Sequence, residues 1–221
     1  MKKEINLILD FDSTIVELET IEVLANFSLE KNPEKNKIYS KIKDMTNLAM
    51  SGKLSFSKAL AKRISLLEAN KTDINKTIKF LKEKVSYSFI KNLSYLNKYN
   101  KNCFIVSGGF REIIIPVLEN FNFIEKNIYA NTFNFNQKNE IVSIDENNPL
   151  SKDKGKNLVI KKLKGYNIIV GDGYTDYEVK KYGNADLFIQ FTGNINRTEL
   201  NQNADFISTD FSEIIEFIHN V

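Results

Sequence analysis

The stretch LILDFDST, Leu7 to Thr14, sets an apolar run directly before two aspartates that flank one phenylalanine. The run is typical of a buried β-strand, in which alternate side chains point to the same face. Asp10 and Asp12 are therefore expected side by side, where their like charges repel. Because a positive group between them would stabilise the pair, the sequence predicts a cation or a basic side chain at this strand end.

Four more short apolar runs follow and alternate with helical stretches. Their residues are apolar in succession, which is typical of parallel strands covered on both faces. The runs occupy 103–107, 167–172, 186–191 and 205–208, and the helical stretches occupy 111–121, 156–164, 176–183 and 212–220. This alternation predicts an α/β fold, a Rossmann-like doubly wound parallel sheet with right-handed crossovers. The segment 130–145 is instead expected to form a hairpin with its turn near 136–139.

One long segment contains no predicted strand. From 15 to 87 the apolar residues follow a helical period, interrupted at Pro33 and Gly52. The predicted organisation is a core formed by 1–14 and 88–221, with a small inserted α-helical cap domain at 15–87. An insertion directly after the first strand would lie over the strand ends, where ligands bind in such sheets, and could act as a lid.

The composition excludes several kinds of chemistry. The chain has 221 residues, of which 42% are hydrophobic and 27% charged, as expected for a globular protein. It contains one cysteine, Cys103, and one histidine, His219. An internal disulfide is therefore impossible, and Ser–His or Cys–His catalysis and a histidine-based zinc site are not expected. An enzyme built from this sequence would use carboxylates, lysine, arginine and hydroxyl groups.

The charge pattern argues against macromolecular partners. The net charge is +3, but the lysines and glutamates are interspersed, so nucleic-acid binding is not expected. No apolar run approaches the length of a membrane span, and the N-terminal stretch does not resemble a signal peptide. We expect a cytoplasmic protein, monomeric or homodimeric, whose partner is a small molecule.

Each of three polar loops follows a predicted strand. The loops are DFDST (10–14), SGGF (107–110) and GDGYTD (171–176). Parallel strands bring all three to one edge of the sheet. Carboxylates from Asp10 and Asp172 suit Mg²⁺, which prefers oxygen ligands. Asp10 could then attack phosphorus, and Asp12 could protonate the leaving oxygen. Taken alone, DFDST is equally consistent with an acidic turn that caps a helix.

The other loops offer groups that bind phosphate. Ser107 and the backbone N–H groups of the glycines after it could donate to phosphate oxygens at a helix start. A lysine in KDKGKNL (152–158) could neutralise phosphoryl charge. We predict Lys154 in this role, although the sequence does not separate it from Lys152 and Lys156.

In this order, the motifs DFDST, SGGF, a later lysine and GDGYTD resemble the haloacid dehalogenase superfamily. The DxDxT form is similar to its phosphatases. The resemblance implies that Asp10 is the phosphorylated nucleophile and Asp12 the general acid/base. It further implies a set of ligand residues. Mg²⁺ would be held by Asp10, the main-chain carbonyl of Asp12, Asp172 and Asp176, and the phosphoryl group by Ser107, Gly108, Lys154 and Thr175.

The resemblance extends into the predicted cap, through DFDSTIVELETIEVLA (10–25) and MSGKLSFSKALAKRISLL (50–67). It implies a phosphatase that hydrolyses O-phospho-L-serine through an aspartyl-phosphate, as in the last step of serine biosynthesis. In such an enzyme Glu19 would bind the ammonium group of the substrate and Arg63 its carboxylate. We also expect Phe56 in the substrate site, because Phe56 and Arg63 are seven residues apart and therefore share one helix face.

Two alternatives remain open at this stage. The first is a related phosphatase or phosphotransferase for another small phosphomonoester, such as phosphohomoserine or phosphoethanolamine. The second is a non-catalytic protein that binds a phosphate ligand on the same scaffold.

Overall fold

We describe a computed structural model of the chain, which places residues 4–98 and 100–221. Residues 1–3, which the predicted core segment 1–14 includes, lie outside the described residues, as does residue 99.

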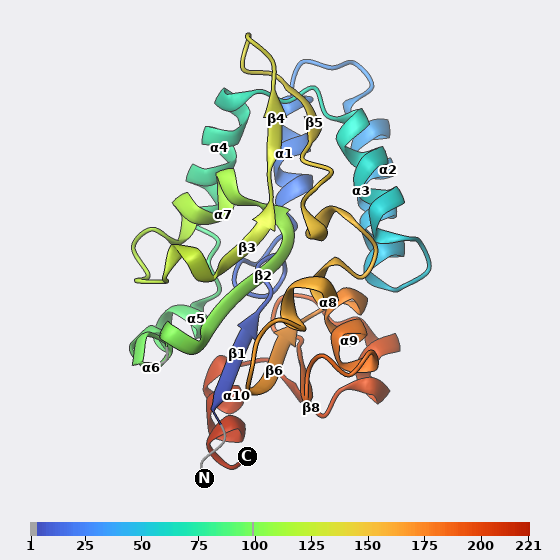
Figure 1. The fold of residues 1–221 in the computed structure, drawn as a ribbon. Coiled ribbons are helices and arrows are strands. Elements are labelled where there is room, and N and C mark those ends of the chain that lie inside the picture. Colours follow the sequence, from blue (N-terminus) through green and yellow to red (C-terminus); the bar gives the residue numbers. More distant parts are fainter. Residues whose placement is uncertain (1–3, 99) are drawn as a thin grey trace.

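Six parallel strands form the central sheet, and five of them match the predicted runs (Figure 1). In spatial order they are β3 (Ile128–Asn131), β2 (Cys103–Phe110), β1 (Ile5–Leu9), β6 (Tyr166–Gly171), β7 (Leu187–Phe191) and β8 (Phe206–Ser208). The first strand lies in the middle, where Leu7 pairs with Cys103 on one side and Ile168 on the other. The loop after β1 is therefore flanked by the loops after β2 and β6.

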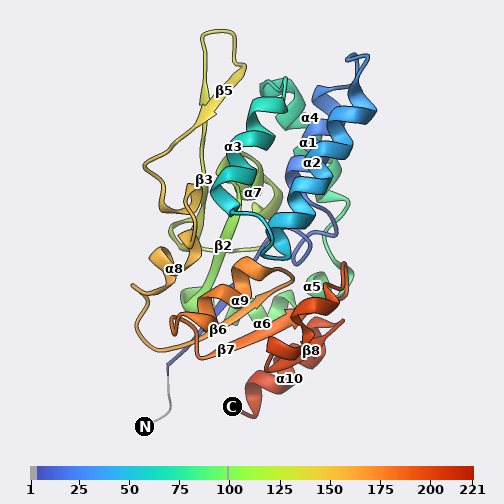
Figure 2. The ribbon, with the colours of Figure 1, turned by 90° about the vertical axis from the view of Figure 1, so that its right-hand side faces the viewer.

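Helices cover both faces of the sheet, so the doubly wound fold is confirmed. One face is covered by α5 (Tyr87–Lys91), α6 (Leu93–Lys98), α7 (Arg111–Leu118) and α10 (Phe211–His219), and the other by α8 (Gly155–Ile160) and α9 (Tyr174–Lys181). Adjacent residues of β1 serve opposite layers, because Leu7 packs with the first set and Ile8 with the second. Figure 2 shows α8 and α10 on opposite sides of the sheet.

Four helices between β1 and α5 form a separate layer over the carboxyl ends of the strands (Figures 1 and 2). They are α1 (Thr20–Ser28), α2 (Lys35–Met50), α3 (Phe56–Leu66) and α4 (Lys71–Lys82). The two chain segments that lead into and out of this layer lie side by side, with Val16 and Val85 joined in an antiparallel bridge. The amide group of Asn194 holds both segments, donating to the carbonyl of Thr14 at 3.2 Å and to Ser86 Oγ at 2.7 Å.

A β-hairpin projects from the core beside these helices. Its strands are β4 (Phe133–Phe135) and β5 (Ile141–Ile144), and the turn closes through a hydrogen bond from Asn139 N to the carbonyl of Asn136, as predicted. The outer edge of β5 accepts the loop between α3 and α4, because Ile141 N donates to the carbonyl of Ala69 at 2.8 Å. The hairpin therefore links the core to the layer formed by helices α1 to α4, which we call the cap layer. The neighbouring strand β3 has only four residues and was not predicted.

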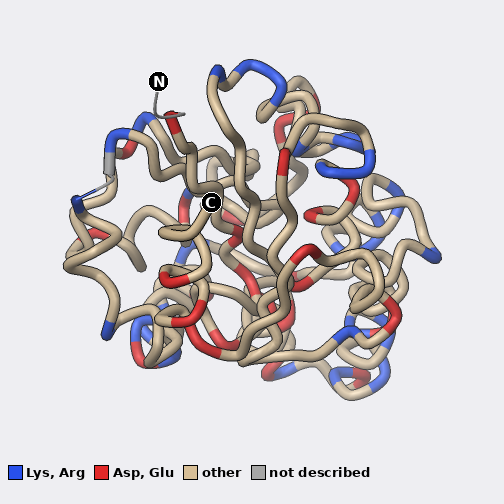
Figure 3. Tube along the Cα trace, turned by 90° about the horizontal axis from the view of Figure 1, so that it is seen from below, with Lys and Arg blue, Asp and Glu red and all other residues tan. Residues whose placement is uncertain are grey.

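No helix in the described part of the chain is long and apolar enough to cross a membrane. Figure 3 shows lysines and arginines distributed around the periphery rather than gathered on one face. Cys103 is fully buried in β2, and burial raises the pKa of its thiol to about 12. This cysteine is therefore a packing residue, as expected.

Candidate active site

The three polar loops meet in one narrow pocket beneath α2 and α3. Of the residues predicted for the site, those that line this pocket are Asp10, Asp12, Glu19, Phe56, Arg63, Ser107, Gly108, Asp172 and Thr175. The free volume is about 20 Å³, which is room for about one water molecule. The cap layer therefore covers the strand ends closely and leaves little free space between them.

Three buried carboxylates form a cluster that could hold a metal ion. One oxygen each from Asp10, Asp172 and Asp176 lies within 4.8 Å of the others. Burial raises the pKa of Asp172 to about 7, with repulsion from Glu19 adding to the effect. Burial also raises the pKa of Asp176, as does the charge of Asp10. Three buried carboxylates this close together repel one another, so a divalent cation would stabilise the set, and their all-oxygen chemistry fits Mg²⁺.

A lysine lies against this cluster, but it is Lys156 rather than the predicted Lys154. Lys156 Nζ lies 2.8 Å from Asp10 Oδ2 and 2.7 Å from Asp176 Oδ1, and its side chain is buried. Although burial disfavours its charge, the two carboxylates raise the pKa of Lys156 above its ordinary value. Lys156 therefore meets the expectation of a basic side chain beside the DFDST loop.

Local backbone geometry explains why Lys156, and not Lys154, reaches the cluster. Lys154 precedes α8 in a left-handed conformation (φ 59°), and its Nζ lies 4.2 Å from the centre of the exposed Tyr182 ring. Lys156 is the second residue of α8, where the helix turns its side chain back toward β1. The position at which α8 begins decides which lysine enters the pocket, and the run of lysines does not reveal that position.

Asp12 is held by the first residue of the cap layer. Thr20 donates from its backbone N at 3.0 Å and from its hydroxyl to Asp12 Oδ1. Burial and repulsion from Glu19 raise the pKa of Asp12 well above its ordinary value. A carboxyl group with a raised pKa can carry a proton near neutral pH, which is the state that a general acid needs.

The loop after β2 forms a wall of the pocket. Gly109 N donates to Ser107 Oγ at 2.9 Å, which fixes the serine side chain. The ring of Phe56, from α3, packs so closely on Gly108 that an added Cβ there would lie 2.5 Å from it. Only glycine at 108 allows α3 to approach the loop in this way. Phe56 therefore lies directly over the predicted phosphate-binding loop.

Glu19 and Arg63 stand at the cap side of the same pocket. Glu19 Oε1 accepts a hydrogen bond from Ser13 Oγ at 2.8 Å. Arg63 is 3% exposed, and its NH1 donates to Thr46 Oγ1 at 2.9 Å. Burial lowers the pKa of Arg63. Burial also raises the pKa of Glu19, and the positive charge of Arg197 partly offsets this rise. Two opposite charges thus face one small space, as a zwitterionic ligand would require.

Arg197 was not predicted, although it contacts both halves of the site. Its Nε donates to Asp172 Oδ2 at 2.8 Å, and its NH2 lies 3.4 Å from Glu19 Oε1. Arg197 lies in the loop after β7, at the same sheet edge as the three polar loops. Because β7 is parallel to β1, β2 and β6, the loop after it was also expected at this sheet edge. No acidic or glycine-rich motif in that loop indicated a functional residue.

The profile of the haloacid dehalogenase-like hydrolases matches residues 7–180. The chain is 32% identical to the phosphoserine phosphatase of Bos taurus over 211 residues, which cover 93% of this chain and 89% of that protein. It is also similar to the crystal structure of a phosphoserine phosphohydrolase-like protein from Francisella tularensis subsp. tularensis SCHU S4, with a TM-score of 0.88 and 28% identity over 97% of this chain and all of that one. A second similar structure is that of a phospho-aspartyl intermediate analogue of phosphoserine phosphatase. The TM-score is 0.78 and the sequence identity 26%, over 98% of this chain and 99% of that one. The chain therefore belongs to the haloacid dehalogenase-like hydrolases, and it is a phosphoric monoester hydrolase.

The two lysines give a direct test of the site's electrostatics. We expect Lys156→Met to lower the free energy of unfolding by about 3–5 kcal/mol without divalent cations, because the buried Asp10 and Asp176 lose their shared partner. Lys154→Met removes an exposed charge and should change that free energy by less than about 0.5 kcal/mol. Urea unfolding in EDTA measures both variants. Equal effects of the two substitutions would contradict the assignment of Lys156 to the cluster.

Proposed function

We propose that this hydrolase converts O-phospho-L-serine to L-serine and phosphate with the help of Mg²⁺, as the last step of serine biosynthesis in the cytoplasm. One observation carries the proposal. A single pocket combines paired aspartates with a glutamate and a buried arginine. The phosphoserine phosphatases among its relatives support the same substrate.

Asp10 and Asp12 divide the chemistry between them. A carboxylate oxygen of Asp10 attacks phosphorus, and the bond between phosphorus and the serine oxygen breaks. Asp12 gives its proton to that oxygen, so serine leaves as a neutral alcohol. Water then attacks the phosphoryl group on Asp10 while Asp12 takes up a proton of that water, which releases phosphate and restores both side chains.

The groups around Asp10 would manage the phosphoryl charge. Mg²⁺, when bound, supplies positive charge that offsets the negative charge of the transferring group. In our proposal Asp10, the Asp12 carbonyl, Asp172 and Asp176 hold it. Lys156 replaces Lys154 in the predicted phosphate-binding set, because it already lies against the nucleophile. The remaining members of that set are Ser107, Gly108 and Thr175, which line the pocket beside it.

The cap side of the pocket would recognise the amino acid. Glu19 would bind the ammonium group, Arg63 the carboxylate, and Phe56 would close the space between them and the phosphoryl loop. We treat 15–87 as the cap domain that carries these groups. Arg197 supports the arrangement, because it already binds Glu19 and Asp172 together. A substrate with only one of the two charges would leave a buried partner unmatched.

Turnover of a substrate panel tests the proposal. We expect phosphate release from phosphoserine in the presence of Mg²⁺, none in excess EDTA, and slower release from phosphothreonine, phosphohomoserine and phosphoethanolamine. Asp10→Asn should lower kcat by about 10⁴-fold or more. Asp44→Asn, an exposed position on α2, is the matched control and should leave kcat unchanged. A protein that binds phosphoserine but releases no phosphate would be a binding protein instead.

Arg63 decides between phosphoserine and substrates without a carboxylate. We expect Arg63→Met to lower kcat/KM for phosphoserine by about 100-fold, since a buried charge-assisted contact is lost. The same variant should change kcat/KM for phosphoethanolamine by less than about threefold. Arg111→Met, on the surface at its ion pair with Glu125, is the control. If phosphoserine turnover survives Arg63→Met unchanged, the substrate assignment is wrong.

A further inference from the structure

A core side chain caps the first turn of a cap helix. Asp153 lies in the loop before α8, and its Oδ1 accepts a hydrogen bond from Ser57 N at 2.9 Å. Ser55 Oγ donates to the same carboxylate, at 2.9 Å from each oxygen. Ser55 and Ser57 flank the start of α3 at Phe56, so the contact joins segments that are almost 100 residues apart in the chain.

This contact has a clear physical basis. The first backbone N–H groups of a helix have no partner within the helix, and a carboxylate at that end satisfies them and matches the helix dipole. Ser55 caps α3 from within the chain by accepting from Lys58 N at 3.3 Å. The N–H of Ser57 is satisfied by Asp153. Despite partial burial, the hydrogen bonds from Ser57 and Ser55 hold the pKa of Asp153 below its ordinary value.

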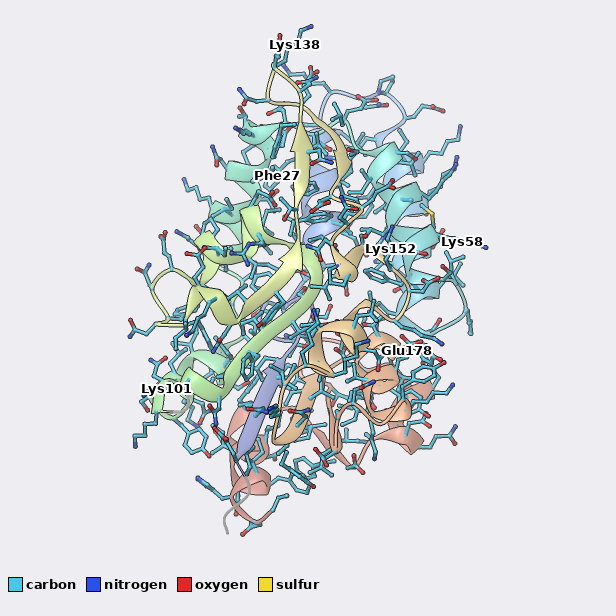
Figure 4. The ribbon with its side chains drawn as sticks, viewed as in Figure 1. Phe27, Lys58, Lys101, Lys138, Lys152 and Glu178 are labelled. Carbon is cyan, nitrogen blue, oxygen red and sulfur yellow. The ribbon has the colours of Figure 1, made fainter. Side chains whose placement is uncertain are left out.

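The two segments that meet here carry different residues of the proposed substrate site. On one side, α3 brings Phe56 and Arg63 into the pocket. On the other side, Asp153 lies three residues before Lys156, which contacts Asp10. Figure 4 shows Lys152, next to Asp153, beside the helix that carries Lys58. A shift of Asp153 relative to α3 would change the distance between the two ends of the pocket.

We propose that Asp153 is a positioning residue that holds α3 against the core when the cap is closed, and so sets Phe56 and Arg63 for substrate binding. Asp153 touches neither the substrate nor the reacting atoms. It acts through the first turn of α3, and its side chain is exposed. This inference rests on the proposed function for its kinetic readout.

Steady-state kinetics with phosphoserine tests the proposal. Asp153→Ala should raise KM about fivefold, the usual effect of losing one helix cap, and change kcat by less than about twofold. Asp153→Asn keeps an oxygen that accepts from Ser57 N and should restore KM to within about twofold of the original. The matched control is Asp210→Ala, which removes the same kind of cap from α10, where Asp210 accepts from Ser212 N at 2.6 Å. The control should leave KM unchanged.

Amide hydrogen exchange gives a readout that does not depend on turnover. In Asp153→Ala the amides at the start of α3, in a peptide covering 55–60, should exchange faster than in the original protein. In Asp210→Ala they should not. An unchanged KM together with unchanged exchange in Asp153→Ala would overturn the inference, and so would an equal rise in KM for Asp210→Ala. If the original protein releases no phosphate from phosphoserine, the proposed function fails, while the exchange result still decides the role of Asp153.

Discussion

The site depends on basic side chains that balance the negative charge of three buried carboxylates. Asp10, Asp172 and Asp176 meet where β1 and β6 end and α9 begins, and burial raises the pKa of Asp172 and of Asp176. Lys156 binds two of them and Arg197 binds the third. Without these cations the carboxylates would be uncompensated charges in a narrow pocket, which is a strongly destabilising arrangement. In the proposed function, the same cluster supplies the nucleophile and the ligands of a divalent cation.

Compensation and recognition are joined through Arg197. Its guanidinium binds Asp172 in the core and Glu19 at the cap, so the acid that would hold the metal and the acid that would bind the substrate's ammonium share a partner. Thr20 connects the two parts in another way, because it begins α1 and donates to Asp12. In the proposed function, these contacts between the cap layer and the core orient Asp12, the proposed general acid, and complete the charge pattern of the site.

Much of this arrangement was predictable from local pattern. Successive apolar residues identified the buried strands, and parallel topology then required the loops at Asp10, Ser107 and Asp172 to meet. The substrate pair Glu19 and Arg63 came from the resemblance to a family, and the structure brings both into one pocket. Each of these features could be predicted because a short sequence motif or a regular spacing of apolar residues indicates it.

Lys156, Arg197 and Asp153 were not predicted, because no motif or regular spacing indicates their contacts. The residue at which α8 begins decides whether Lys154 or Lys156 reaches the carboxylates. That position depends on the packing of Val159 and Ile160 against the sheet. Arg197 lies in an irregular loop, and its role follows from the positions of Asp172 and Glu19, which are distant in sequence. The contact of Asp153 with α3 likewise forms only once cap and core are packed together. Sequence patterns predict elements, whereas these contacts depend on the way the elements meet.

The central claim is that Asp10 carries the phosphoryl group during turnover. Its most direct test is acid quenching of the protein during turnover of phosphoserine with Mg²⁺, followed by digestion and mass spectrometry. The account predicts one added phosphoryl group on the peptide that contains Asp10, lost on treatment with hydroxylamine and absent from Asp10→Asn. Phosphate release with no phosphoryl group on Asp10, or with the group on another side chain, would contradict it.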